Sequence, residues 1–176
     1  ALPAAALPSS RSPVRTLLVV ASVAVFGLGG LTACSSAAAA DLVVGDCLKM
    51  GGPPDRPEAT KAACGTPESN FKVVAAVEET DQCPSDVDSY YSMGSAFSDA
   101  RTTICMDIDW VVGDCMSIDP DNGRDPLRVD CNDASMAGRQ RATQILENVA
   151  SVDQCTSGVG YAYDERSFTV CVEDVA

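Results

Sequence analysis

The feature that most constrains the fold of this chain is an internal duplication. The pentapeptide Val-Val-Gly-Asp-Cys occurs at residues 43–47 and again at 111–115, and both halves contain the tripeptide Asp-Gln-Cys. Each half also holds four cysteines, and equivalent cysteines lie 66 to 72 residues apart. Self-similarity at a nearly fixed spacing indicates repeated structural units. We therefore predict two tandem repeats, which cover residues 42–108 and 109–176.

The segment before the repeats has the layout of an export signal. Arg11 and Arg15 are the only charged residues among the first 33, and an apolar run of 15 residues follows at 17–31. This length suits the hydrophobic region of a signal peptide and is short for a membrane-spanning helix, which needs about 20 residues. Leu31-Thr32-Ala33-Cys34 then resembles the bacterial lipobox, which implies cleavage before Cys34 and acylation of that cysteine.

We therefore predict a lipoprotein signal peptide at 1–33 and a lipidated tether at 34–41. Diacylglyceryl and palmitate-type chains on Cys34 would hold the protein on the extracytoplasmic face of the cell membrane, because each buried methylene contributes about 0.8 kcal/mol. Two alternatives stay open, an uncleaved signal anchor and a Cys34 that is free or disulfide-bonded.

Eight cysteines in an exported chain are expected to form disulfides. The repeats contain no Cys-x₂-Cys pair, which zinc sites and redox-active dithiols commonly use. Turn-forming residues between the first two cysteines of each repeat predict a hairpin that brings them face to face, and the other two then pair by elimination. Pairing across the repeats is the main alternative. The predicted pairs are Cys47–Cys64, Cys83–Cys105, Cys115–Cys131 and Cys155–Cys171.

The pattern of apolar and turn-forming residues predicts an α+β, β-rich fold with the order β-β-β-α-β in each disulfide-stapled repeat. Pro84 and the aspartates that follow it favour a short helix over 83–91. The turns are expected at 51–55 and 119–123. The expected strands are 42–50, 59–64, 71–78 and 102–107 in the first repeat, and 111–118, 126–131, 140–148 and 168–173 in the second.

The lipobox, the doubled Gly-Asp-Cys and Asp-Gln-Cys motifs, and the segments Gly-Tyr-Ala-Tyr at 160–163 and Phe-Thr-Val-Cys-Val-Glu-Asp at 168–174 resemble the mycobacterial LppU lipoprotein family. The first repeat is also similar, more loosely, to modules of actinobacterial septum-formation proteins. The resemblance implies an exported, membrane-anchored lipoprotein of the cell envelope. It supplies no catalytic residues.

The composition argues against several classes of function. The chain has no histidine, which excludes Ser-His-Asp and Cys-His catalysis and zinc sites with a histidine ligand. The net charge is −13, and removal of Arg11 and Arg15 with the signal peptide makes it −15. So acidic a chain is not expected to bind nucleic acid, because phosphate binding relies on lysine and arginine.

Three motifs that could carry chemistry have simpler structural explanations. Ser69 and Lys72 match the Ser-x-x-Lys spacing of penicillin-binding proteins, in which the two residues lie one helical turn apart, but here Lys72 lies on the strand predicted at 71–78 and Ser69 is expected in the loop before it. Residues 119–125 resemble a calcium loop, but their glycine is in the wrong position and a hairpin turn is expected. Asp46 and Asp114 could form an acid/base pair, but each is expected to hydrogen-bond a turn amide.

We therefore predict no catalytic residues, no metal and no cofactor, and a non-enzymatic role in binding or in envelope interaction. The alternatives are an envelope hydrolase that uses paired carboxylates and a structural envelope component. The partners are the membrane, through lipid on Cys34, and an unidentified envelope protein or ligand. Aromatic residues are the expected lining of a binding groove, with Trp110 at the repeat junction. The expected tyrosines are Tyr90, Tyr91, Tyr161 and Tyr163.

Overall fold

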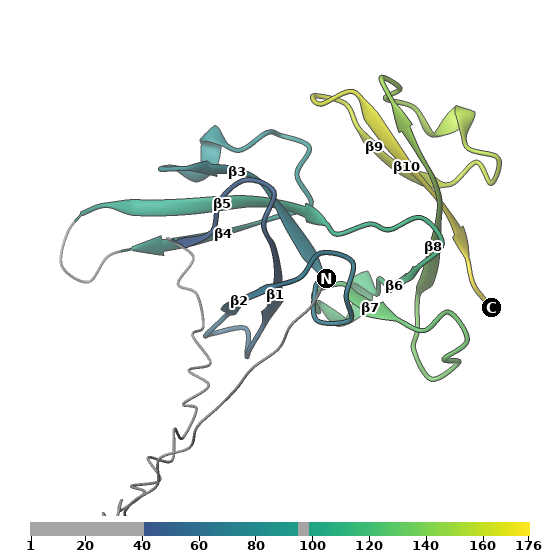
Figure 1. The fold of residues 1–176 in the computed structure, drawn as a ribbon, viewed down its shortest axis with the longest axis horizontal. Coiled ribbons are helices and arrows are strands. Elements are labelled where there is room, and N and C mark those ends of the chain that lie inside the picture. The colour runs from purple at the N-terminus through teal and green to yellow at the C-terminus, as the bar shows by residue number, and fades with distance from the viewer. Residues whose placement is uncertain (1–40, 95–98) are drawn as a thin grey trace, which may run out of the picture. The chain divides into compact units, whose positions relative to one another are not determined.

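A computed structural model describes residues 41–94 and 99–176 of the chain. The predicted signal peptide, Cys34 and all of the predicted tether except Asp41 lie outside the described residues. Within the described part, ten strands form two five-stranded antiparallel sheets, and three short 3-10 helices lie in the connections between strands (Figure 1). No helix in this part is long and apolar enough to cross a bilayer.

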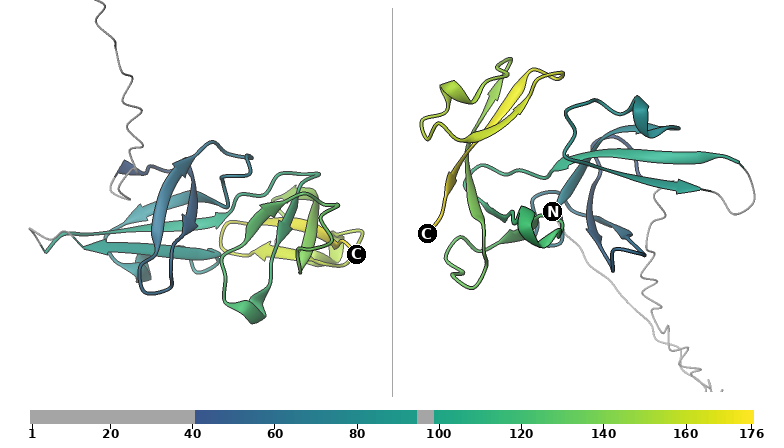
Figure 2. Two further views of the ribbon diagram at one scale, coloured as in Figure 1. Left: turned by 90° about the horizontal axis from the view of Figure 1, so that it is seen from below. Right: turned by 180° about the vertical axis from the view of Figure 1, so that it is seen from behind.

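Each repeat forms one sheet, and the two sheets have the same topology. The strand order is β2-β1-β3-β5-β4 in the first repeat and β7-β6-β8-β10-β9 in the second, so the two orders are equivalent strand for strand (Figure 2). The strands of the first sheet are β1 (Cys47–Gly51), β2 (Glu58–Ala62), β3 (Phe71–Val77), β4 (Ser89–Gly94) and β5 (Arg101–Ile108). Those of the second are β6 (Cys115–Ser117), β7 (Leu127–Val129), β8 (Arg139–Glu147), β9 (Gly160–Tyr163) and β10 (Phe168–Asp174).

The prediction of an α+β fold is wrong, because the described residues contain no α-helix. The predicted helix over 83–91 is replaced by a turn that leads into β4, and the only helical turn nearby is the 3-10 helix η2 (Thr80–Gln82), which ends before Cys83. Burial alternates residue by residue along β4, as expected for a strand with one covered face. The aspartates that favoured a helix start bind groups far away in the chain instead: Asp86 contacts Arg166, and Asp88 contacts Tyr163.

The predicted disulfide pairing is confirmed, although the predicted geometry of the hairpins is not. All four expected bonds are present, within the repeats, with Cα–Cα distances of 5.0 to 5.6 Å. Cys115, however, lies opposite Val129, and Cys131 follows two residues after that partner. The turn at 119–123 contains the 3-10 helix η3 (Pro120–Asn122), so it is wider than the two-residue Asn-Gly turn that the sequence suggested.

The two repeats bury very different amounts of apolar side chain. The first core contains eight buried residues of the first repeat together with Met116 of the second, and the second core contains only four buried residues. The first core is made of Leu42, Leu48, Met50, Phe71, Val73, Ile104, Met106, Ile108 and Met116. The second is made of Ala142, Tyr163, Val170 and Val172, with Trp110, Tyr161 and Phe168 packed against it.

Strand register explains this difference. In the first sheet, Leu48, Phe71 and Ile108 lie opposite one another on three neighbouring strands. The equivalent row in the second sheet is Met116, Gln140 and Asp174. Two large apolar residues of the first row are therefore polar in the second. The second sheet cannot close an apolar core of the same size on this face, and part of the face stays accessible.

Candidate ligand cleft between the two repeats

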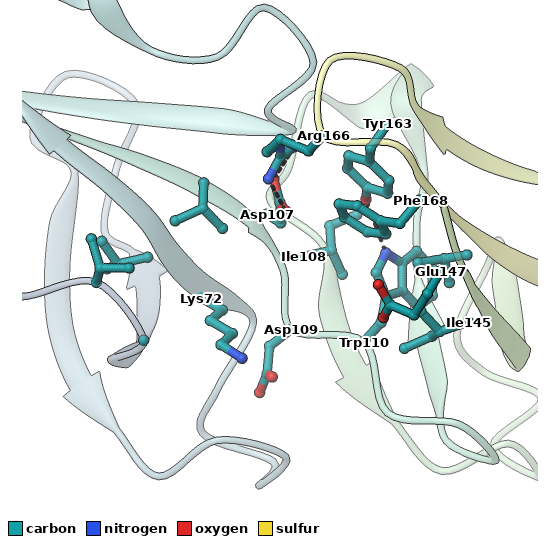
Figure 3. Close-up of a pocket in the computed structure, with 15 residues that line it drawn as sticks. Lys72, Asp107, Ile108, Asp109, Trp110, Ile145, Glu147, Tyr163, Arg166 and Phe168 are labelled. Atoms are coloured by element: carbon teal, nitrogen blue, oxygen red, sulfur yellow. Dashed lines mark hydrogen bonds and ion pairs between the residues drawn. The ribbon is translucent and has the colours of Figure 1, made fainter. Parts of the chain in front are cut away.

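A cleft of about 540 Å³ lies between the two repeats, within the range typical of ligand sites. Its lining comes from β3, the end of β5 and the turn before β1 in the first repeat, and from the connecting segment and strands β8 to β10 in the second. The lining residues are Val44, Gly45, Lys72, Val73, Val74, Asp107, Ile108, Asp109, Trp110, Ile145, Glu147, Tyr163, Arg166, Phe168 and Val170. Figure 3 shows Lys72 and Asp109 on one side and Trp110, Ile145, Glu147 and Phe168 on the other.

The wall from the second repeat consists of two rows of side chains that run across three strands. Glu147, Phe168 and Tyr163 are cross-strand neighbours, and the Tyr163 and Phe168 rings stack with centroids 4.2 Å apart. Ile145 and Val170 belong to the adjacent row. Directly opposite residues on a sheet lie close enough to form one continuous surface. The wall is thus apolar and aromatic, with one carboxylate at the edge of the sheet.

A buried ion-pair cluster connects the repeats at one end of the cleft. The Arg166 guanidinium, in the turn between β9 and β10, donates to both carboxylate oxygens of Asp107, one of them at 2.9 Å, and through Nε to Asp86 at 2.7 Å. Its carbon also lies 5.1 Å from the Tyr163 ring centroid. Burial raises the pKa of Asp107 despite Arg166, whereas for Asp86 the hydrogen bonds and charge of Arg166 outweigh burial and hold the pKa below its usual value. We call Arg166, Asp86 and Asp107 the latch.

A second chain of hydrogen bonds reinforces the latch. The buried Tyr163 hydroxyl donates to the Asp88 carboxylate at 2.7 Å and accepts from the Trp110 indole N–H at 3.3 Å. Asp88 is exposed as a residue, but its oxygen Oδ2 also accepts from the Ile108 amide at 2.8 Å. Burial of this carboxylate and the neighbouring Asp107 raise the pKa of Asp88, and burial and Asp88 raise the pKa of Tyr163. These contacts fix the aromatic wall against the first repeat.

The latch also leaves a lysine of the cleft unpaired. Arg141 and Glu173 lie opposite each other in the second sheet and form an ion pair at 3.1 Å. The equivalent residues of the first sheet are Lys72 and Asp107, which also lie opposite each other. Because Arg166 binds Asp107, the Lys72 ammonium has no hydrogen-bond or ion-pair partner among the described residues.

A second polar junction, centred on Arg128, also connects the two repeats. The Arg128 side chain is only 6% exposed and donates to the Asp114 carboxylate at 2.9 Å, to the Thr66 carbonyl at 3.2 Å and to the carbonyl oxygen of Asp109. The Asp109 carboxylate accepts from the Ser69 hydroxyl at 2.6 Å and also from Arg128. Ser69 therefore makes a structural contact, and the position of Asp109 at the repeat boundary is the one sequence signal for this junction.

Of the two duplicated aspartates, Asp46 binds a turn amide as predicted, and Asp114 binds an arginine instead. Asp46 accepts from the Val43 amide at 3.1 Å and from Lys61 at 2.8 Å, and these hydrogen bonds lower its pKa despite some desolvation. Asp114 accepts from Arg128, which occupies in β7 the position that Lys61 occupies in β2. Each carboxylate is thus bound by a cation of its own repeat.

The four predicted tyrosines do not gather at one place. Tyr163 lines the cleft, whereas Tyr161 belongs to the cross-strand row of Ile145 and Val170 but packs against Trp110, with ring centroids 5.3 Å apart, and does not line the cleft. Tyr91 packs against the first core and donates to the Pro57 carbonyl, while Tyr90 is exposed on the opposite face of β4. The sequence reasoning missed Arg166, Lys72, Glu147, Ile145 and Phe168.

The described residues offer little for a metal ion. The one group of possible ligand atoms that approach one another in this part is Cys47, Cys64 and Asp109. Both sulfurs are joined in a disulfide, and Asp109 already accepts three hydrogen bonds. In the loop at 119–125, the Asp119 carboxylate accepts from the Asp121 amide and the Asn122 side chain, which are turn contacts.

Comparison of the chain with protein-family models, with curated proteins and with solved structures finds no match.

Proposed function

We propose that this protein is an exported lipoprotein, anchored through Cys34 to the outer face of the cell membrane, that binds an envelope component in the cleft between its repeats without transforming it. The lipobox and the resemblance to the LppU lipoprotein family support the anchor. The cleft supports the binding role. Four disulfides and the latch hold its walls, as a preorganised binding site requires.

The observation that carries the proposal is the combination of an aromatic wall with charged side chains that have no partner. Lys72 and Glu147 line opposite walls, and neither makes a hydrogen bond or ion pair with another described residue. Ligand sites are typically apolar surfaces with a few polar groups that fix orientation. Trp110, Phe168 and Ile145 provide the apolar surface.

The chemistry of the carboxylates favours binding over hydrolysis. A glycosidase-type reaction needs one carboxyl group with a raised pKa close to a second, ionised one. Asp46 has a lowered pKa and is bound by Lys61, and Asp114 is bound by Arg128. The carboxyls with raised pKa values in the cluster, Asp88 and Asp107, accept hydrogen bonds from the protein itself.

Anchoring is tested by intact-mass analysis and membrane fractionation of the full chain and of Cys34→Ala. The expected result is a diacylglyceryl-modified protein in the membrane fraction and an unmodified variant that is lost from it. A Cys34→Ala protein with normal processing and membrane association would contradict the proposed anchor.

Binding is tested in cells with a photo-crosslinking residue at position 145 or at position 90. Ile145 is 37% exposed at the cleft, and Tyr90 is 57% exposed outside it. We expect a discrete adduct from position 145 and none from position 90. No adduct at 145, or the same adduct at both positions, would contradict a binding role for the cleft.

A further inference from the structure

We infer that the ligand of the cleft is a membrane phospholipid with a zwitterionic amine headgroup, whose acyl chain lies on the aromatic wall. This inference rests on the proposed anchor at Cys34. It names the chemical class of the component that the cleft binds.

The length of the tether keeps the cleft close to the membrane. Val44 and Gly45 line the cleft, and Val44 follows Cys34 by ten residues. A fully extended chain spans at most about 3.3–3.6 Å per residue, so ten residues reach roughly 35 Å. A lipidated Cys34 sits at the bilayer surface. The mouth of the cleft therefore remains about one bilayer thickness or less from the lipid headgroups.

Two exposed valines closely follow the tether in the sequence, and one of them, Val44, lines the cleft. Val43 and Val44 are 61% and 62% exposed, although they stand in a turn that precedes a buried strand. Val44 and Val74 line the cleft from the first repeat, and Ile145 lines it from the second. Transfer of an apolar side chain from water to lipid is favourable by about 25 cal/mol for each Å² of its surface that is removed from water. A membrane surface next to the tether is the partner that would cover them.

The charges in the cleft select the headgroup. Lys72 on one wall can bind a phosphate, and Glu147 on the other can accept hydrogen bonds from a primary ammonium (Figure 3). An anionic headgroup would meet Lys72 but would also meet Glu147 and a mature chain of net charge −15, that is, 10 Lys+Arg after loss of Arg11 and Arg15 against 25 Asp+Glu. A zwitterionic phosphoethanolamine group matches both walls.

The chain contains a natural probe for this contact. Trp110 is its only tryptophan, and it lines the cleft. The full-length lipoprotein is reconstituted in phosphatidylethanolamine-containing vesicles whose acyl chains are either brominated or plain. Bromine quenches indole emission only at near contact. We expect lower Trp110 emission in brominated vesicles, and weaker quenching when phosphatidylglycerol replaces phosphatidylethanolamine.

The duplication supplies a matched control. Val44→Asp places a charge at the mouth, and Val112→Asp places the same charge at the equivalent position of the second repeat, which is 52% exposed and does not line the cleft. Val44→Asp should lose most of the quenching, and Val112→Asp should keep it. Ile145→Glu, within the cleft wall, should also lose it, and near-ultraviolet circular dichroism checks that each variant is folded.

Two readouts separate the inference from the proposed anchor. Flotation of the protein with vesicles reports anchoring, and quenching reports occupation of the cleft. Failure of the wild-type protein to float would refute the anchor. A protein that floats but shows equal Trp110 emission in brominated and plain vesicles would overturn the lipid inference. A shift of Trp110 emission that soluble envelope peptides produce and vesicles do not would also overturn it, because the ligand of the cleft would then be a peptide.

Discussion

Replacing Arg166 with alanine should separate the contribution of the latch from that of the two sheets. The change removes four hydrogen bonds from the Arg166 side chain to the first repeat and leaves the carboxylates of Asp86 and Asp107 without their cation. These carboxylates are only 9% and 10% exposed, and the arginine is 20% exposed. Breaking a buried ion pair costs about 3–5 kcal/mol, and the partial exposure of Arg166 favours the lower end, about 3 kcal/mol. For a domain of this size, that lowers Tm by roughly 6–12 °C.

The pH dependence of the loss in Tm of Arg166→Ala tests whether that loss is electrostatic. Burial already raises the pKa of Asp107 while Arg166 is present, and removal of the cation should raise it further. A carboxyl whose pKa is higher in the folded state than in the unfolded state stabilises the fold when protonated, so stability rises as pH falls through the folded-state pKa. The difference in Tm between the wild type and Arg166→Ala should therefore narrow from neutral pH toward the unfolded carboxyl pKa of about 4. Adding Asp107→Asn should recover part of the loss at neutral pH.

Arg141→Ala is the matched control for this measurement. Arg141 binds Glu173 at 3.1 Å in an ion pair whose side chains are 40% and 47% exposed, and such surface pairs contribute only about 0–1 kcal/mol. Thermal unfolding of both variants by circular dichroism across pH 4 to 8 compares a buried and an exposed pair. Equal losses of Tm, or a loss in Arg166→Ala that does not change with pH, would refute the role assigned to the latch.

Three further outcomes follow from the structure. Asp88→Asn keeps an acceptor for the Tyr163 hydroxyl but removes a carboxylate whose pKa is raised by burial. The Tm at neutral pH should therefore stay equal or rise, and the difference in Tm from wild type should vanish on acidification. A marked loss of Tm at neutral pH would contradict this. Removing the Cys115–Cys131 bond by a double alanine substitution should cost about 3 kcal/mol, measured by denaturant unfolding, whereas no loss would contradict a stabilising role. A chelator should leave Tm unchanged, and a drop of about 5 °C or more would indicate a metal site.

The parts of the fold that the sequence predicts are those that local patterns determine. The repeats share short identical motifs, so the doubled topology and the pairing of cysteines follow from their spacing. Strands such as β3 and β10 are found within one or two residues of the expected ranges because apolar β-branched residues dominate them. The predicted helix over 83–91 is wrong because two of its signals, Asp86 and Asp88, make long-range contacts that reach 75 to 80 residues along the chain.

The cleft could be predicted only in part, for a similar reason. The prediction of an aromatic groove named Trp110, at the repeat junction, and Tyr163, and both line the cleft. Tyr90 and Tyr91 were expected there as aromatic residues, but adjacent residues on a strand face opposite ways, so they cannot share one surface. Arg166 lies in the turn between β9 and β10, and nothing in the sequence of that turn indicates a long-range partner. Only the packing of one repeat on the other shows that Arg166 binds Asp107.

The two cores differ in size because the duplicated copies have diverged along one row of the sheet. A sheet needs apolar side chains across one face to close a core, and the row of Leu48, Phe71 and Ile108 does so in the first repeat. Where the second repeat has Gln140 and Asp174 instead, the two polar side chains hydrogen-bond each other at 3.0 Å, and the core beside them stays small. The first repeat thus has the larger apolar core, and the cleft wall of the second repeat lies toward the Phe168 end of β10, away from Asp174. An isolated second repeat would expose its cleft wall and would leave Met116 without the first core in which it is buried. We therefore expect the binding surface to exist only in the paired repeats.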